Sequence, residues 1–265
     1  YKSAGREYKV DALSYEPIYS ADDLVIITGT ITSGLNLYTY VGAPAGVVNL
    51  VIVFDGTIVG SQTNTEPSVM AGNATGTFAP GSTLKIILAN GADLQAKGGD
   101  GGKGEGIFRS GTTVKYVLPT NGKNAGTVFD ANGVTCDIYF SGATSEAAPY
   151  DVADGYILAP GGGDGGKDSV SFDPEVLTTG NGGNGGDGRA VGFGGVPGSK
   201  TGTFLEFGNS GAAGTDNRLV GLYGINGANN DATGGLMGKG IIDNGATVTL
   251  NGDNAVRYIN GSGDH

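Results

Sequence analysis

The chain has 265 residues, of which 53 are glycine, and it carries a formal net charge of −11 with only 15% charged residues. So acidic a composition argues against the clustered lysine and arginine residues that bind nucleic-acid phosphates or anionic membrane surfaces. Hydrophobic residues make up 38% of the chain, which allows a lean core, and no apolar run reaches the ~18 residues of a membrane span.

Two single residues add to this. Cys136 has no second cysteine to pair with, so the chain cannot form an intrachain disulfide and is not built around an oxidising compartment. The chain begins at Tyr1 without Met and shows no signal peptide, so we expect it to be part of a longer polypeptide.

In chain order, the sequence predicts strands and almost no helix. Segments rich in β-branched and aromatic residues are separated by Gly, Asn and Asp, which supply the positive φ angles of turns. The predicted strands are Leu24–Thr32, Leu35–Val41, Val47–Phe54, Ser82–Ala89, Thr112–Leu118, Val134–Phe140 and Ala246–Leu250.

An internal repeat links strands to glycine runs. The segment "ANGADLQAKGGDGGK" (Ala89–Lys103) aligns without gaps on "ADGYILAPGGGDGGK" (Ala153–Lys167), at an offset of 64. Each copy has an Asn-Gly or Asp-Gly pair, a short strand and a glycine run. We therefore predict a strand-rich β region at 1–97, a glycine-rich region at 98–240 and a closing β segment at 241–265.

The glycine runs allow three interpretations. A flexible linker favours Ser beside Gly and needs no register, whereas these runs follow an aligned strand motif. Collagen needs Gly at every third position and many prolines over tens of residues, which these short runs lack. The third interpretation is polyglycine in the polyproline-II conformation, which we favour.

A Gly-Gly-X repeat in that conformation has three residues per turn, two bare edges and one edge of side chains. The bare edges let neighbouring backbones touch, and their N–H and C=O groups then bond laterally. We therefore predict an all-β fold with polyglycine-II helices packed as a sandwich and almost no α-helix. The polar X residues are expected to face solvent: Asp100, Lys103, Asp164, Lys167, Asn184 and Asp187.

Glycine-rich binding motifs fit poorly. Gly161-x4-Gly166-Lys167 resembles a phosphate loop, but Asp168 stands where Ser or Thr would hold magnesium. Gly183-x-Gly185-x-x-Gly188 matches a dinucleotide fingerprint in letters only. The calcium β-roll pattern begins at Gly182 but fails at Arg189, which occupies an apolar position. We predict no cofactor and no metal.

Catalytic patterns are equally weak. Cys136 lies in an apolar strand pattern, which favours a packed thiol, and His265 stands alone. The carboxylate pairs Asp22–Asp23 and Asp151/Asp154 are interpreted as solvated loop acids. We predict no enzyme, although a glycosidase stays open because its two acids can be far apart in sequence.

The order of motifs resembles a known family. It runs "GVVNLVIVFDGTIVGS", "TFAPGSTLKIILANGADLQAKGGDGGKG", "ADGYILAPGGGDGGK" and "GGLMGKGIIDNGATVTLNG". This plan resembles the C-terminal glycine-rich region of tailed-phage tail fibres and of tail-tip host-specificity proteins of the protein J type, over about residues 45–260. The Gly-Gly-X runs are also similar to the distal adhesin of T-even long tail fibres.

The resemblance implies an adhesin of the virion tail, assembled in the bacterial cytoplasm beside other tail proteins. It would attach the virion to a bacterial surface receptor, whether protein, pilus or glycan. The tail-tip type implies a homotrimer and the T-even type a monomeric cap. This chain departs from the pattern at Asp168–Thr179 and Thr201–Asp231, which we interpret as candidate receptor loops.

Recognition on such a scaffold is expected in loops, with aromatic residues and Arg as anchors. The candidates flanking the runs are Phe108, Arg109, Tyr150, Phe172, Phe193, Phe204, Phe207, Arg218 and Tyr223. The alternative is that these rings cover the edges of the glycine layer. A structural fibre component and a polysaccharide-degrading tailspike stay open as other functions.

Overall fold

The computed structural model describes residues 23–61, 63, 65–104, 106–110, 113–143, 150–158, 160, 162–166, 232–236 and 238–252. These residues form thirteen strands and one four-residue helix. The expectation of a nearly all-β chain with almost no α-helix is therefore confirmed.

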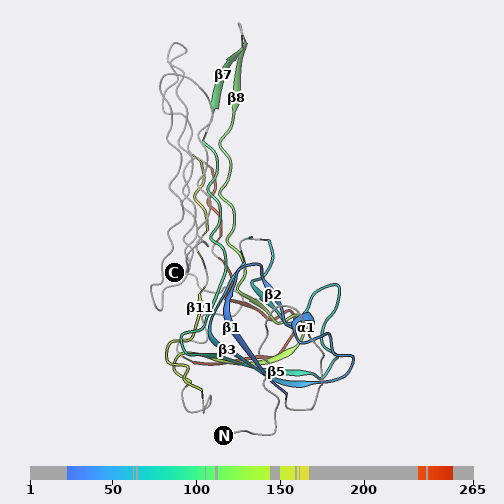
Figure 1. The fold of residues 1–265 in the computed structure, drawn as a ribbon. Helices are drawn as coiled ribbons and strands as arrows, with labels where there is room; N and C mark the ends of the chain where they lie inside the picture. The colour runs from blue at the N-terminus through green and yellow to red at the C-terminus, as the bar shows by residue number, and fades with distance from the viewer. Residues whose placement is uncertain are drawn as a thin grey trace.

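Most strands belong to two parallel sheets (Figure 1). The larger sheet contains β1 (Asp23–Ile31), β3 (Asn49–Val59), β5 (Thr83–Ala89), β6 (Asp93–Gln95), β10 (Thr135–Tyr139), β11 (Tyr156–Leu158) and β13 (Val248–Asn251). The smaller sheet contains β2 (Leu35–Asn36), β4 (Val69–Met70), β9 (Phe129–Asp130) and β12 (Ile241–Ile242). We call these eleven strands the sheet body.

The chain alternates between the two sheets from β1 to β5, whereas the consecutive strands β5 and β6, and likewise β10 and β11, both belong to the larger sheet. Strands of later coils lie parallel to strands of the preceding coil, as β3 does to β1, β5 to β3 and β10 to β5. The body is therefore wound like a solenoid, in which every coil buries its apolar residues against its neighbours.

Ladders of apolar residues fill the space between the sheets. The register of the large sheet aligns Val25, Ile52, Ile86, Ile138 and Leu250 from five successive strands. The first four are at most 3% exposed, and Leu250 packs against the same cluster. Because both faces of a parallel sheet tend to be covered, its strands are nearly continuous apolar runs such as "TLKIILA" in β5.

Asn-Gly pairs make turns between consecutive strands. Asn90, Asn132 and Asn244 have φ angles of 52°, 46° and 47°, and each is followed by a glycine of positive φ. Asn tolerates this left-handed conformation better than other non-glycine residues. The predicted role of Asn and Gly in turns is confirmed at these positions.

One predicted strand is largely wrong. The segment Leu35–Val41 is a strand only at Leu35–Asn36 and then becomes the helical turn α1 (Leu37–Tyr40). Asn36 caps this turn, since its Oδ1 accepts from Thr39 N at 3.3 Å. Burial of Leu37 and the edge-on packing of Tyr38 against Phe78 stabilise the turn in spite of its strand-like composition.

The internal repeat corresponds to neighbouring strands. β6 and β11 are parallel partners, and Leu94 pairs with Ile157 at an offset of 63 rather than the 64 of the sequence alignment. A shift of one residue reverses the face on which a strand residue lies, so burial of both Leu94 and Ile157 in the core determines the register. Furthermore, β9, β10 and β11 belong to the sheet body although they lie within the predicted region 98–240.

Candidate functional site

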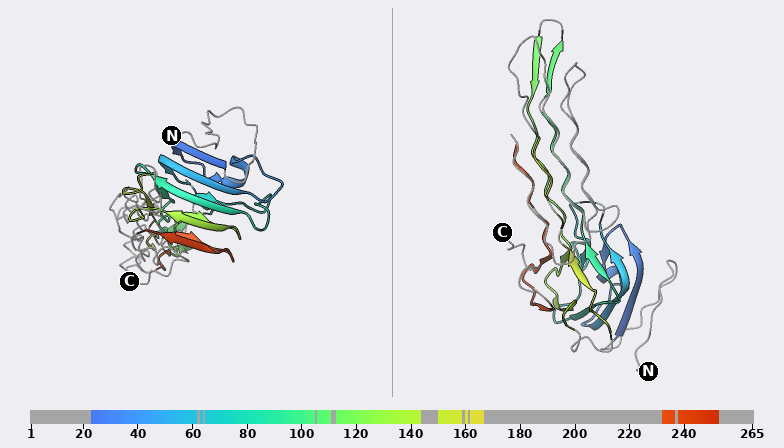
Figure 2. Two further views of the ribbon diagram at one scale, coloured as in Figure 1. Left: turned by 90° about the horizontal axis from the view of Figure 1, so that it is seen from below. Right: turned by 90° about the vertical axis from the view of Figure 1, so that its left-hand side faces the viewer.

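A long stem extends away from the sheet body (Figure 1 and Figure 2). The described residues of this stem form four extended limbs: the first at residues 97–104, the second at 118–126, the third at 160–166 and the fourth at 232–239, of which residues 161 and 237 are not described. The first and third limbs follow β6 and β11, and the second and fourth lead into β9 and β12. The limbs therefore begin and end beside parallel strands that are already paired.

The second limb donates hydrogen bonds to two neighbouring limbs, to each of them at every third residue. It donates backbone N–H groups to the first limb in the pairs Thr120 to Lys103, Lys123 to Asp100 and Gly126 to Lys97, at 2.8–2.9 Å. It also donates to the fourth limb's carbonyls in the pairs Gly122 to Thr233 and Ala125 to Leu236, both at 2.9 Å. Residues 120, 123 and 126 thus bond to the first limb, whereas residues 122 and 125 bond to the fourth.

The same spacing holds around the third limb. It donates to the second limb in the pairs Gly163 to Lys123 and Gly166 to Thr120, both at 3.0 Å. It accepts from the fourth limb in the pairs Ala232 to Gly166, Gly235 to Gly163 and Gly238 to Pro160, at 2.7–3.0 Å. Backbone N–H and C=O groups that an isolated extended segment would leave to water are therefore hydrogen-bonded within the stem.

Glycines occupy positions at which the backbones of neighbouring limbs are in close contact. A Cβ placed on Gly163 would collide with Asp100 O of the first limb, and one placed on Gly162 would collide with Gly235 O of the fourth. Gly166 and Gly165 repeat the two contacts three residues later, against Lys103 O and Ala232 O. The two glycines of each triplet therefore face two different neighbours, and the third position is left for a side chain.

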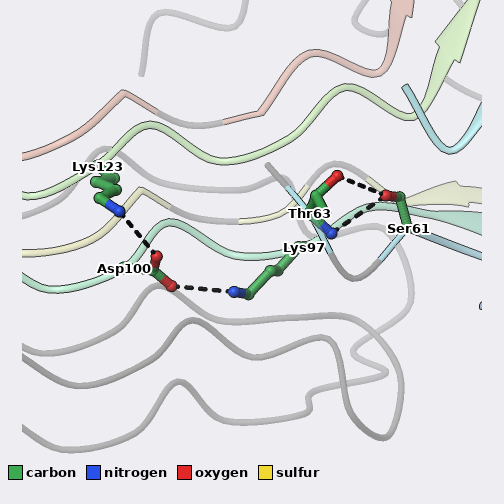
Figure 3. A network of polar contacts seen from close by, with 5 residues as sticks. All are labelled: Ser61, Thr63, Lys97, Asp100 and Lys123. Atoms are coloured by element: carbon green, nitrogen blue, oxygen red, sulfur yellow. Dashed lines mark hydrogen bonds and ion pairs between the residues drawn. The ribbon is translucent and has the colours of Figure 1, made fainter. Parts of the chain in front are cut away.

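Charged side chains form ion pairs along the stem. Asp100, with a 19% exposed side chain, lies 3.2 Å from Lys97 Nζ and 3.5 Å from Lys123 Nζ, as Figure 3 shows. Lys103 is exposed, as predicted, whereas Asp100 and Asp164 are partly buried. Lys167, Asn184 and Asp187 lie outside the described residues.

The stem carries an antiparallel hairpin at the end remote from the sheet body (Figure 1 and Figure 2). Its strands are β7 (Gly106–Ser110) and β8 (Thr113–Val117), and they pair only with each other among the described strands. Two of the predicted receptor residues, Phe108 and Arg109, lie in β7 and therefore at this end of the molecule.

Tyr150 lies elsewhere. It is partly buried on the sheet body and packs against a small cluster that includes Val53, Ile87 and Val152. The alternative interpretation placed these rings at the edges of the glycine layer, whereas Tyr150 packs on the sheet body. The structure thus separates Tyr150 from Phe108 and Arg109 by the length of the stem.

The other candidate residues lie outside the described part of the chain. They are Phe172, Phe193, Phe204, Phe207, Arg218 and Tyr223. Both candidate receptor loops, Asp168–Thr179 and Thr201–Asp231, lie there as well.

The hairpin also contains residues that sequence reasoning did not select. Lys115 is the partner of Phe108, and Tyr116 is the partner of Ile107. The signal was present in "GIFRSGTTVKYV", where two β-rich runs flank the short Gly-Thr connection of a hairpin. Only the second of these runs was predicted as a strand.

Candidates for chemistry have ordinary structural roles. Cys136 is fully buried, and burial, with a smaller contribution from Asp137, raises the pKa of its thiol to about 12. Such a thiol is neutral at physiological pH and is a poor nucleophile. Asp151 Oδ1 accepts from Ala153 N in its own turn at 3.0 Å, and Asp154 is exposed.

The phosphate-loop pattern and the acidic groups can be placed in part. Residues 162–166 of the phosphate-loop pattern are an extended limb of the stem rather than a turn before a helix. Within the described ranges no three His, Cys, Asp or Glu residues come together as a metal site. No helix there has the length and apolar character needed to cross a membrane.

Comparison of the chain with models of protein families, with curated proteins and with solved structures finds no match.

Proposed function

We propose that the limbs of the stem are polyglycine-II helices packed as a sandwich. The three-residue spacing of the hydrogen bonds supports this, since the polyproline-II conformation repeats every three residues. The positions of Gly162, Gly163, Gly165 and Gly166 support it too, because each places a bare edge against a neighbouring backbone. A bundle joined laterally in this way is a stiff rod.

We further propose that the protein is a receptor-binding adhesin of a phage tail fibre or tail tip. The observation that carries this proposal is the hydrogen-bonded stem, which holds the β7–β8 hairpin away from the sheet body. A rod with a small terminal element suits contact with a distant surface, and recognition by loops on a rigid scaffold is a common arrangement. The motif order described above points to the same kind of protein.

In this proposal the sheet body is the end nearer the virion and contacts other tail proteins, while the far end of the stem contacts a bacterial surface receptor. The protein acts by binding, without catalysis, and it is assembled in the host cytoplasm into the virion tail. We propose a homotrimer, for which the mass of the purified chain in solution is the direct test. A monomeric mass would favour a cap on the end of a fibre.

Binding to intact bacteria tests the function. Purified, fluorescently labelled protein should bind a subset of strains in a panel and should block infection of those strains by the phage that carries it. Binding to no strain, together with unimpaired infection at saturating protein, would contradict the proposal and favour a structural fibre component. Release of reducing ends from surface glycans would instead favour a polysaccharide-degrading tailspike.

A further inference from the structure

We propose that the β7–β8 hairpin recognises an anionic glycan. This inference rests on the proposed receptor-binding function and adds the chemical class of the receptor. It derives from three features of the hairpin: its position, its charge and the pairing of its residues.

The hairpin is positioned to make first contact. It lies at the end of the stem opposite the sheet body and is a two-stranded sheet, antiparallel where the sheets of the body are parallel (Figure 1). Among the described strands the hairpin pairs with no third strand, and an isolated two-stranded hairpin is only marginally stable in water. Its presence at the end of a rod is therefore better explained by a binding role than by a contribution to stability.

The charge of the hairpin is opposite to that of the rest of the chain. Residues 106–117 contain Arg109 and Lys115 and no Asp or Glu, whereas the whole chain has a net charge of −11. An anionic surface would repel the rest of the chain and attract the hairpin. The field would thus orient the approach of the molecule with the hairpin first.

The strand register places one cationic and one aromatic residue on each face of the ribbon. Phe108 is directly opposite Lys115, so these two residues share one face of the ribbon. Ile107 is opposite Tyr116 and Arg109 is opposite Val114, so Arg109 and Tyr116 are diagonal neighbours on the other face. Aromatic rings provide an apolar surface for the flat faces of sugar rings, and the cations suit carboxylate or phosphate substituents.

The size of the hairpin favours a glycan over a protein receptor. Each strand has five residues. A stable protein–protein interface usually buries about 800 Å² on each partner, contributed by about 20–30 residues. Ten strand residues are too few for that, whereas a few sugar units can be held by a few contacts. We therefore commit to an anionic surface polysaccharide, bearing uronate or phosphate groups.

The experiment uses the full chain and defined polymers. Wild-type protein is titrated against immobilised alginate, which carries carboxylates, against a phosphomannan, which carries phosphates, and against dextran, which is neutral. We expect binding to at least one anionic polymer, no binding to dextran, and weakening as salt is raised, since salt screens the charges. The two anionic arms distinguish carboxylate from phosphate recognition.

Matched variants localise the binding. The double variant Arg109→Gln/Lys115→Gln should bind the anionic polymer at least about tenfold more weakly. The control Lys123→Gln/Lys239→Gln removes the same charge from the stem and should bind like wild type. The variant Arg109→Lys/Lys115→Arg keeps both charges and should retain most binding, which separates loss of charge from loss of the hairpin.

Several outcomes would overturn the inference. Equal binding of dextran, no binding of either anionic polymer, or undiminished binding by the double Gln variant would each reject it. Binding to bacteria that protease treatment abolishes and periodate oxidation leaves intact would identify a protein receptor and reject the glycan, while leaving the proposed adhesin function in place. Glycan binding without attachment to any bacterium would contradict the adhesin function instead.

Discussion

The sheet body and the stem are stabilised in opposite ways. In the body, side chains fill the space between two sheets, and residues such as Phe54 and Ile52 are completely buried. In the stem, no side chains separate neighbouring limbs at Gly162 and Gly163, and the backbones there are in direct contact. One region depends on apolar volume and the other on its absence.

The two regions nevertheless share a spacing. The first and third limbs follow β6 and β11, which are paired parallel strands. Paired strands lie about 4.8 Å apart, so the limbs leave the body at the distance of a sheet rather than the 8–10 Å of packed helices. Where two such segments are not paired as β-strands, their backbones can form hydrogen bonds at that distance only if no Cβ lies between them. The sheet body thus sets the distance between the limbs, and the glycines allow the backbones to approach to that distance without a steric clash.

The largest effect should come from removing volume in the body. Phe54→Ala leaves a cavity in the core and should lower the free energy of unfolding by about 3–5 kcal/mol, measured by chemical denaturation. The control is Leu118→Ala in the stem, where the side chain is 74% exposed and the change should stay within about 0.5 kcal/mol. Similar losses for the two variants would show that the stem also depends on apolar burial.

Adding volume to the stem should have the next largest effect. Gly163→Ala places a methyl group against Asp100 O and should destabilise the stem by about 1–3 kcal/mol, the usual range for overpacking. Amide hydrogen exchange should speed up at Lys123, Gly163 and Gly235 while the body amides stay protected. Gly46→Ala, whose Cβ would meet nothing within 4 Å, is the matched control. Unchanged exchange in the Gly163 variant would argue against the tight backbone contact.

The pH dependence of the body should reflect Cys136. The pKa of its thiol is about 12 in the folded protein against an ordinary value of 9.0, so the unfolded chain loses this proton first as pH rises. Stability from this group is complete below pH 9 and is lost progressively toward pH 12; between pH 8 and pH 10 the loss is about 1 kcal/mol. Denaturation of Cys136→Ala across this range should show a correspondingly smaller decline. An identical decline would show that other groups account for the pH dependence.

The smallest effect should come from charges on the stem. Asp100→Asn removes both ion pairs with Lys97 and Lys123, one of which is 67% exposed, and should cost less than about 1 kcal/mol. The difference from wild type should shrink as sodium chloride is raised. Glu66→Gln, an exposed change of the same charge, provides the baseline. A loss that salt does not reduce would indicate that Asp100 acts through backbone contacts instead.

Local features were predictable from the residues alone. Turns at Asn90, Asn132 and Asn244 follow from the tolerance of Asn and Gly for positive φ, which is a property of single residues. Strands such as β5 and β10 follow from β-branched and apolar runs between those turns. The Gly-Gly-X spacing likewise predicts which edges of a limb can approach a neighbour, because a Cβ is either present or absent.

Long-range features depended on the folded molecule. The parallel order of the strands, the offset of 63 between the repeat copies and the change from strand to helix at Leu37 depend on which residues share the core. The same holds for the separation of Tyr150 from Phe108, which a linear distance cannot reveal. A residue's torsion angles are local properties, whereas its neighbours and its register are settled by packing between segments far apart in the chain.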